Sequence, residues 1–411
     1  MFRPNKTGWI LFLLLVTLLF SLFTVYAFSH ATVTVSARAA TLYEPKTQTF
    51  LYEKNADMRL PMASTTKIMT ALVVLEHADL DTKVTVDPRA VDVEGSSLYL
   101  TEGEVLTVEE LLFGLMLRSA NDAAEALACE IAGSVPAFVE MMNEKAVAMG
   151  LTDTHFETPH GLDGKEHYTT ARELAYITAA ALENEDFRRI VSTYKVTLGD
   201  DPVRLVVNHN KLLSLYDGAV GVKTGFTKKS GRCLVGAAER EGLTLITVTL
   251  DAPSDWSDHE TLFDLGYSLL ECRAPLAPRD VCYDLPVVGG DAQTLTVSNA
   301  DGYSYVARKN APPVRREVRL PHYIAAPVAK GEAVGSVLLY EGDTLLTEIP
   351  LTAESAVPLP KKKSFFQRFS GNSAPAVKRS RLRAESAQSP NIESIRPRCL
   401  FGTCGNTTGD T

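Results

Sequence analysis

Apolar and polar residues follow two different periods along this chain, and the period changes from one region to the next. Apolar residues recur at helical spacing in five stretches between residues 64 and 182. Two of these stretches open on capping boxes, Thr107-Val108-Glu109-Glu110 and Thr170-Ala171-Arg172-Glu173. We predict helices over residues 64–77, 111–117, 122–133, 136–149 and 174–182.

Short apolar runs split by turn residues flank this helical block and predict strands. We expect strands over residues 39–43, 49–53, 219–225, 233–238 and 243–250, and a closing helix over residues 260–270. Helices inserted between strand regions predict an α/β domain, in which an antiparallel sheet carries a helical lobe. After the Pro-rich residues 274–278, strand-like runs over 294–297, 303–306 and 334–340 predict a small C-terminal all-β domain.

The first 37 residues have the pattern of an export signal. Arg3 and Lys6 precede an uncharged, Leu- and Phe-rich run over residues 9–28, and the next charged residue is Arg38. A basic start followed by an apolar run is typical of a signal peptide, but this run is also long enough to span a bilayer. Residues 1–37 are therefore either a cleaved signal or a retained membrane anchor, and we expect the rest of the chain to be extracytoplasmic.

Charge is distributed unevenly. The net charge is −9, yet residues 361–411 hold ten Lys or Arg and only three Asp or Glu. An acidic body disfavours nucleic acid as a partner. Residues 356–411 lack periodicity and are predicted to be a disordered basic tail. Its basic, aromatic stretch over residues 361–369 is suited to contact with a membrane surface or wall polymer, or to a solvated linker.

The six cysteines are few for an exported protein of this size. Two lie in apolar patterns and are predicted core residues, Cys129 and Cys233. The other four form two pairs that are close in sequence, Cys272/Cys282 and Cys399/Cys404, and both pairings stay open. No His and Cys spacing typical of a metal site is present, so no metal or cofactor is expected.

Ser64-Thr65-Thr66-Lys67 lies at the start of the first predicted helix. A serine hydroxyl is a poor nucleophile until a base takes its proton. Lys67 is one helical turn from Ser64 and projects from the same face, so it can reach the hydroxyl. The tetrad alone is not specific, because the chain holds a second one, Ser192-Thr193-Tyr194-Lys195.

Two further motifs follow the first tetrad along the chain, first Ser119-Ala120-Asn121 and then Lys223-Thr224-Gly225. This order of S-x-x-K, S-x-N and K-T-G resembles the penicillin-binding proteins and serine β-lactamases. With the stretches over residues 159–163, 167–172 and 230–234, the chain is most similar to serine-type D-alanyl-D-alanine carboxypeptidases that carry a C-terminal β domain. The resemblance covers residues 38–355 and implies a penicillin-binding/β-lactamase-like transpeptidase fold. We place the catalytic domain at 38–276 and the β domain at 277–355.

The motif residues suit an acyl-transfer reaction on peptidoglycan stem peptides. Ser64 would attack the carbonyl between two D-alanines, with a neutral Lys67 as the base. A nearby cation, expected to be Lys223, would keep Lys67 neutral. Ser119 can relay a proton to the leaving amine, and Asn121 can hold Lys67 and the substrate amide.

The third motif suits the free carboxylate of the terminal D-alanine. Lys223 and Thr224 offer it charge and a hydroxyl donor. Gly225 would let the peptide add to a strand edge. The resemblance implies that the backbone N–H groups of Ser64 and Phe226 form the oxyanion hole. β-Lactam antibiotics are then expected to acylate Ser64.

Some features depart from the β-lactamases. The second motif is S-A-N, and no E-x-x-L-N segment supplies a deacylating glutamate, so Glu157 and Glu166 are predicted to be solvated. An acylating β-lactam should leave slowly. The loose histidine cluster, His155, His160 and His167, is predicted to be loop structure. A β-lactamase, a D,D-endopeptidase or a non-hydrolytic β-lactam sensor remain as alternatives.

Overall fold

The computed structural model describes residues 33–361, which divide into two compact units between Glu271 and Cys272. The predicted signal or anchor falls almost wholly outside these residues, as do Cys399, Cys404 and nearly all of the basic tail. No helix within residues 33–361 is long and apolar enough to cross a bilayer.

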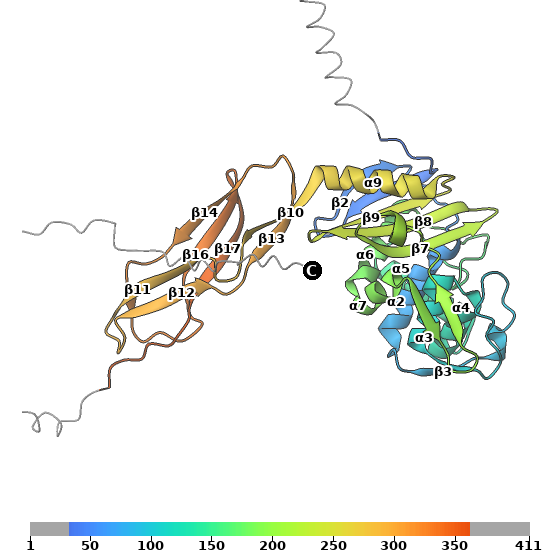
Figure 1. Ribbon diagram of the computed structural model, residues 1–411, viewed down its shortest axis with the longest axis horizontal. Helices are drawn as coiled ribbons and strands as arrows, with labels where there is room; N and C mark the ends of the chain where they lie inside the picture. Colours follow the sequence, from blue (N-terminus) through green and yellow to red (C-terminus); the bar gives the residue numbers. More distant parts are fainter. Residues whose placement is uncertain (1–32, 362–411) are drawn as a thin grey trace, which may run out of the picture. The chain divides into compact units, whose positions relative to one another are not determined.

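The first unit is built on one antiparallel sheet with the strand order β2-β1-β9-β8-β7 (Figure 1). Its strands are β1 (Ala39–Glu44), β2 (Thr49–Lys54), β7 (Ala219–Thr227), β8 (Gly231–Arg240) and β9 (Leu243–Leu250). All five predicted strands are thus confirmed, with ends shifted by at most two residues. The sheet brings together the N-terminal and C-terminal parts of the unit, because β1 pairs with β9.

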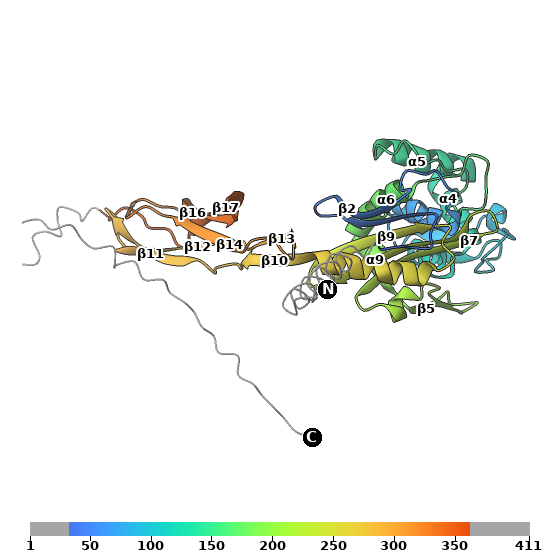
Figure 2. The same ribbon diagram turned by 90° about the horizontal axis from the view of Figure 1, so that it is seen from above.

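Helices cover both faces of this sheet. The helices are α2 (Lys67–His77), α3 (Val108–Phe113), α4 (Asn121–Ala132), α5 (Val135–Ala148), α6 (Ala171–Glu183), α7 (Glu185–Ser192), α8 (Leu212–Leu215) and α9 (Asp255–Leu269). Helix α9 packs on one face and α6 on the other (Figures 1 and 2). The central strand β9 is therefore buried on both sides: His259 of α9 bonds to Thr247 and Thr249, whereas Ile246 and Val248 face the main core.

Local sequence explains several helix ends. The Thr107 capping box opens α3, and Thr170 caps α6 by accepting from the Glu173 backbone N–H. Gly133 ends α4 in a left-handed conformation, as a C-cap glycine commonly does. The predicted helix over residues 260–270 begins five residues earlier, at Asp255.

Smaller elements complete the unit. Two short hairpins pair β3 (Lys83–Thr85) with β4 (Val105–Thr107), and β5 (Lys195–Leu198) with β6 (Arg204–Val207). Single turns of 3₁₀ helix cover Ala63–Thr66 and Pro88–Ala90, and a π-helical turn covers Gly114–Arg118. Helix α7 and both hairpins were not predicted.

The second unit is all β, as predicted. Strands β14 (Val314–Arg319), β16 (Ala333–Glu341), β17 (Thr344–Ala353), β12 (Thr294–Asn299), β11 (Cys282–Val288) and β15 (Ile324–Ala325) form one sheet in that order, and β10 (Leu270–Leu276) pairs with β13 (Tyr303–Arg308). Within the six-stranded sheet, pairing is antiparallel except for the two residues of β15. A tight turn between Glu341 and Thr344 joins β16 to β17. Cys272 forms no disulfide, so the possible Cys272–Cys282 bond is not made.

Candidate active site

The first S-x-x-K tetrad opens a buried helix. Ser64 lies in the 3₁₀ turn that leads into α2, and Lys67 is the first residue of α2. In a 3₁₀ turn, residues i and i+3 lie one above the other. Lys67 Nζ is accordingly 3.1 Å from Ser64 Oγ. Lys67 itself is 0% exposed, which is exceptional for a lysine.

Three oxygen atoms surround the Lys67 amine. Besides Ser64 Oγ, Nζ lies 2.7 Å from Asn121 Oδ1 and 2.6 Å from the backbone oxygen of His160. The latter two oxygens can only accept hydrogen bonds. A neutral amine has two N–H groups for them and one lone pair, which is then left to face the Ser64 hydroxyl. This geometry fits a base aimed at Ser64.

The electrostatics also favour a neutral Lys67. Burial, and next the positive charge of Lys223, hold the pKa of Lys67 well below its usual value, although Asp122 opposes them. The Asp122 carboxylate is occupied elsewhere, since it accepts from the backbone N–H groups of Leu98 and Leu100. It thereby holds the loop before residue 100 against the start of α4.

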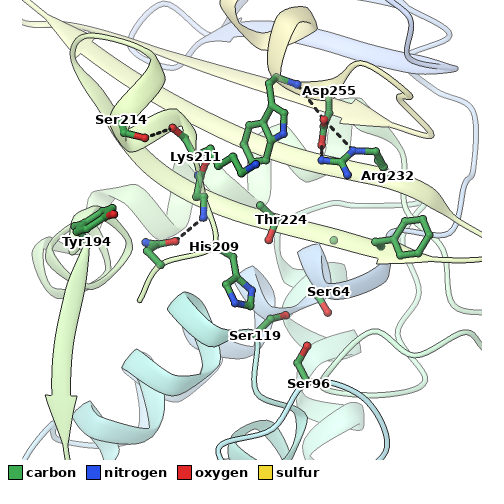
Figure 3. A pocket seen from close by; sticks show the side chains of 15 residues that line it. Ser64, Ser96, Ser119, Tyr194, His209, Lys211, Ser214, Thr224, Arg232 and Asp255 are labelled. Carbon is green, nitrogen blue, oxygen red and sulfur yellow. Dashed lines mark hydrogen bonds and ion pairs between the residues drawn. The ribbon is translucent and has the colours of Figure 1, made fainter. Parts of the chain in front are cut away.

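The S-x-N motif lies where a π-helical turn meets α4. Ser119 has a left-handed backbone (φ 64°), which is uncommon for a residue with a side chain. Ser119 is 6% exposed and lines the same cleft as Ser64 (Figure 3). Asn121 is the first residue of α4, and its Nδ2 donates to the Glu94 backbone oxygen, which orients Oδ1 toward Lys67.

The K-T-G motif lies on β7, the edge strand beside the nucleophile. Lys223 is 1% exposed, and burial lowers its pKa to about 7. Thr224 lines the cleft. Gly225 passes so close to the nucleophile that a Cβ there would be 3.0 Å from the Ser64 backbone nitrogen. Phe226 follows and is 66% exposed at the mouth.

A cleft of about 720 Å³ brings these motifs together (Figure 3). All eight residues predicted for the site lie in or directly beside it: Ser64, Lys67, Ser119, Asn121, Lys223, Thr224, Gly225 and Phe226. The second S-x-x-K tetrad, Ser192 to Lys195, has a different environment. Ser192 and Lys195 are exposed, and the Ser192 hydroxyl donates to the Arg189 backbone oxygen.

The cleft also has lining residues that sequence reasoning did not single out. They include Ser96, Tyr194, His209, Lys211, Arg232 and Trp256. Arg232 pairs with Asp255 at 2.9 Å, and both lie across the cleft from Tyr194 in Figure 3. One signal was available: β7 and β8 form a tight hairpin, whose register places Arg232 opposite Phe226.

The histidine loop, which holds His155, His160 and His167, contacts the segment over residues 64–67. His160 and His167 are buried, whereas His155 is bonded to the Glu166 backbone oxygen at the surface. Glu157 and Glu166 are exposed, as predicted. Within residues 33–361, no three His, Cys, Asp or Glu side chains are grouped so that they could hold a metal ion.

The cleft combines three chemical groups: the Ser64 hydroxyl, the buried Lys67 amine aimed at it, and a second buried lysine, Lys223, on the edge strand β7. That set defines a serine acyl-transfer enzyme. A family model for D-alanyl-D-alanine carboxypeptidases matches residues 26–254, and one for the C-terminal domain of penicillin-binding protein 5 matches residues 274–359.

Similar proteins agree with both matches. The D-alanyl-D-alanine carboxypeptidase DacF of Bacillus subtilis is 31% identical over 82% of this chain and 90% of its own length. Penicillin-binding protein 5 of Haemophilus influenzae is 27% identical over 80% of this chain and 99% of its own, with a TM-score of 0.59. The Streptomyces K15 DD-transpeptidase is 37% identical over 58% of this chain and 100% of its own, with a TM-score of 0.55.

The chain therefore belongs to the D-alanyl-D-alanine carboxypeptidase family. This confirms the predicted resemblance, the predicted class of enzyme, and the penicillin-binding/β-lactamase-like fold with its C-terminal all-β domain.

Proposed function

We propose that this protein removes the terminal D-alanine from peptidoglycan stem pentapeptides through an acyl-enzyme on Ser64. The observation that carries the proposal is the buried Lys67 amine, whose third contact is Ser64 Oγ at 3.1 Å. Lys67 takes the hydroxyl proton as Ser64 Oγ attacks the carbonyl carbon. The backbone N–H groups of Ser64 and Phe226 stabilise the oxyanion.

The remaining motif residues complete the cycle. Ser119 passes the proton to the departing D-alanine amine, and water then hydrolyses the ester on Ser64. Lys223, which is partly protonated near pH 7, holds the substrate carboxylate together with Thr224 and disfavours a charge on Lys67. β-Lactams acylate the same hydroxyl. Neither Glu157 nor Glu166 lines the cleft, so neither is placed to activate water against the ester on Ser64, and the β-lactam adduct is long-lived.

The setting of this activity is also proposed. The basic and apolar start over residues 1–37 supports export, with the catalytic domain at 38–276 and the β domain at 277–355 outside the cytoplasmic membrane. Ten Lys or Arg in residues 361–411 support a contact of the tail with anionic lipid or wall polymer.

A labelling and turnover experiment tests the chemistry. Fluorescent penicillin should label the wild type and the matched control Ser192→Ala but not Ser64→Ala. D-Alanine release from a synthetic pentapeptide should follow the same order. Labelling of Ser64→Ala would overturn the assignment.

Assays with other substrates separate the alternatives. Rapid nitrocefin turnover would indicate a β-lactamase. Cleavage of cross-linked muropeptides without release of free D-alanine would indicate a D,D-endopeptidase. An acyl-enzyme that forms without any peptide turnover would indicate a β-lactam sensor.

A further inference from the structure

The histidine loop is pressed against the segment that carries the nucleophile. Thr70 Oγ1 of α2 donates to the Pro159 backbone oxygen at 2.5 Å. Gly161 has a left-handed backbone (φ 89°), and a Cβ there would overlap the Ala63 backbone oxygen. Only glycine therefore fits at this position. Between Pro159 and Gly161 lies His160, whose backbone oxygen accepts from Lys67.

The protonation of the His160 ring follows from its partners. The Leu162 backbone N–H donates to His160 Nδ1 at 3.2 Å, so Nδ1 is an acceptor. In a neutral imidazole the proton then belongs to Nε2. Nε2 lies 3.3 Å from Glu125 Oε1. His160 is 5% exposed, and burial lowers the pKa of its imidazole although the hydrogen bond with Glu125 opposes this, so the ring places no positive charge beside the neutral Lys67 at neutral pH.

Glu125 reaches this ring from the same helix that carries Asn121. The two residues are four apart on α4 and so lie on one face. Asn121 contacts the Lys67 amine directly. Glu125 contacts the residue whose backbone oxygen receives the other N–H of Lys67. Helix α4 is thus connected to both acceptors of the Lys67 amine.

We infer that Glu125 and His160 are a pair of positioning residues for the acylation step. The Glu125 carboxylate holds the imidazole, the imidazole fixes the His160 backbone oxygen, and that oxygen directs the Lys67 lone pair to Ser64. The inference rests on the proposed role of Lys67 as base. It adds a residue pair to the site that none of the three motifs contains.

The test uses the acylation rate constant of the full chain and the affinity for the β-lactam before acylation, measured separately by stopped-flow with fluorescent penicillin. Glu125→Ala should lower the rate constant on the order of tenfold, because a small misplacement of a reacting group is costly. The affinity should stay within twofold. Glu125→Gln, which keeps an acceptor for Nε2–H, should restore most of the rate. The matched control is Glu130→Ala, an exposed glutamate on the same helix.

A double-mutant cycle makes the pairing itself testable. His160→Phe keeps an aromatic ring without the donor, and the double variant should be no slower than either single one. His160→Gln, which retains an N–H donor, covers the case in which the Phe variant does not fold. Additive losses, a Glu125→Ala rate within twofold of wild type, or a loss confined to affinity would overturn the inference.

Failure here differs from failure of the proposed function. If Ser64→Ala still labels, the acyl-enzyme assignment itself is wrong. If only Ser64→Ala fails to label and Glu125→Ala acylates normally, the reaction stands and the positioning pair does not.

Discussion

The chain contains the pattern Ser-Thr-x-Lys twice, and the two copies differ in their position in a helix and in the burial of their lysine. Ser64 begins a helix, and the Lys67 amine lies 3.1 Å from its hydroxyl. Ser192 ends α7, and its hydroxyl donates back to its own helix at Arg189. Lys67 is 0% exposed, whereas Lys195 is exposed on the hairpin strand β5. Direction in the helix and depth in the fold separate the two copies.

The difference shows what a tetrad needs before it can act. At the start of a helix, backbone N–H groups are free to meet an oxyanion, whereas the end of a helix offers carbonyl groups. Burial then makes the charged amine costly, so that the lysine can serve as a base. The second copy has neither condition.

A charge-retaining substitution in each copy tests the difference between the two tetrads, and it has the largest expected effect. Lys67→Arg should lower the rate of acylation by fluorescent penicillin by about 10³-fold or more, because arginine keeps its proton and cannot act as a base. Lys195→Arg, the same change in the exposed copy, should leave the rate within twofold. Normal acylation by Lys67→Arg would remove Lys67 from the role of base.

The next largest effect is expected from filling the space beside Ser64 in the first tetrad. Gly225→Ala should lower the acylation rate on the order of 10²-fold, because the added Cβ would lie 3.0 Å from the Ser64 backbone nitrogen, where the oxyanion is expected. The backbone of Gly225 is not left-handed, so the conformation itself tolerates alanine. Thermal unfolding should therefore change far less than the rate. An alanine variant that acylates within threefold of wild type would contradict the close approach.

The smallest effect is a pH dependence of stability. Burial lowers the pKa of Lys223 to about 7, whereas a lysine in the unfolded chain titrates near 10.4. Between these pH values the unfolded state binds a proton that the folded state lacks. The free energy of unfolding should thus rise with pH across this window, by up to about 1.4 kcal/mol per pH unit from this residue.

Lys223→Met removes that contribution, together with the positive charge that lowers the pKa of Lys67. Urea unfolding between pH 7.5 and 9.5 should show a shallower rise with pH for the variant than for the wild type. Below pH 7 the two slopes should converge, since both states of the wild type are then protonated at Lys223. Equal slopes throughout would mean that Lys223 is not buried as a lysine of low pKa.

Much of the fold could be predicted because its elements have long or clean patterns. The strands β7, β8 and β9 were predicted within two residues of their ends, since each is a run of apolar residues between turn signals. Helix α7 was missed although Phe187, Ile190 and Val191 form its buried face. A helix of eight residues offers too few repeats of the period to be distinguished from a strand or loop.

The residues of the candidate site likewise fall into those that could be predicted from the sequence and those that could not. Its eight predicted residues could be found because three short motifs carry them in a fixed order. Glu125, His160 and Arg232 have no such motif. The contact of Glu125 with His160 depends on a loop that packs against α4, and it joins residues far apart in the sequence. Arg232 is placed by the register of the β7–β8 hairpin, which a strand prediction with uncertain ends does not fix.

Sequence alone was enough to predict the strands of the central sheet, most of the longer helices, the residues able to do the chemistry and the family to which they belong. The order of the motifs already favoured the first tetrad over the second, but the tertiary structure was needed to show how the Lys67 amine is buried, aimed at Ser64 and kept neutral. The physical reason is that a pKa and an orientation are not properties of a residue type. They come from lost water and from contacts such as Asn121 and His160, which lie 54 and 93 residues from Lys67.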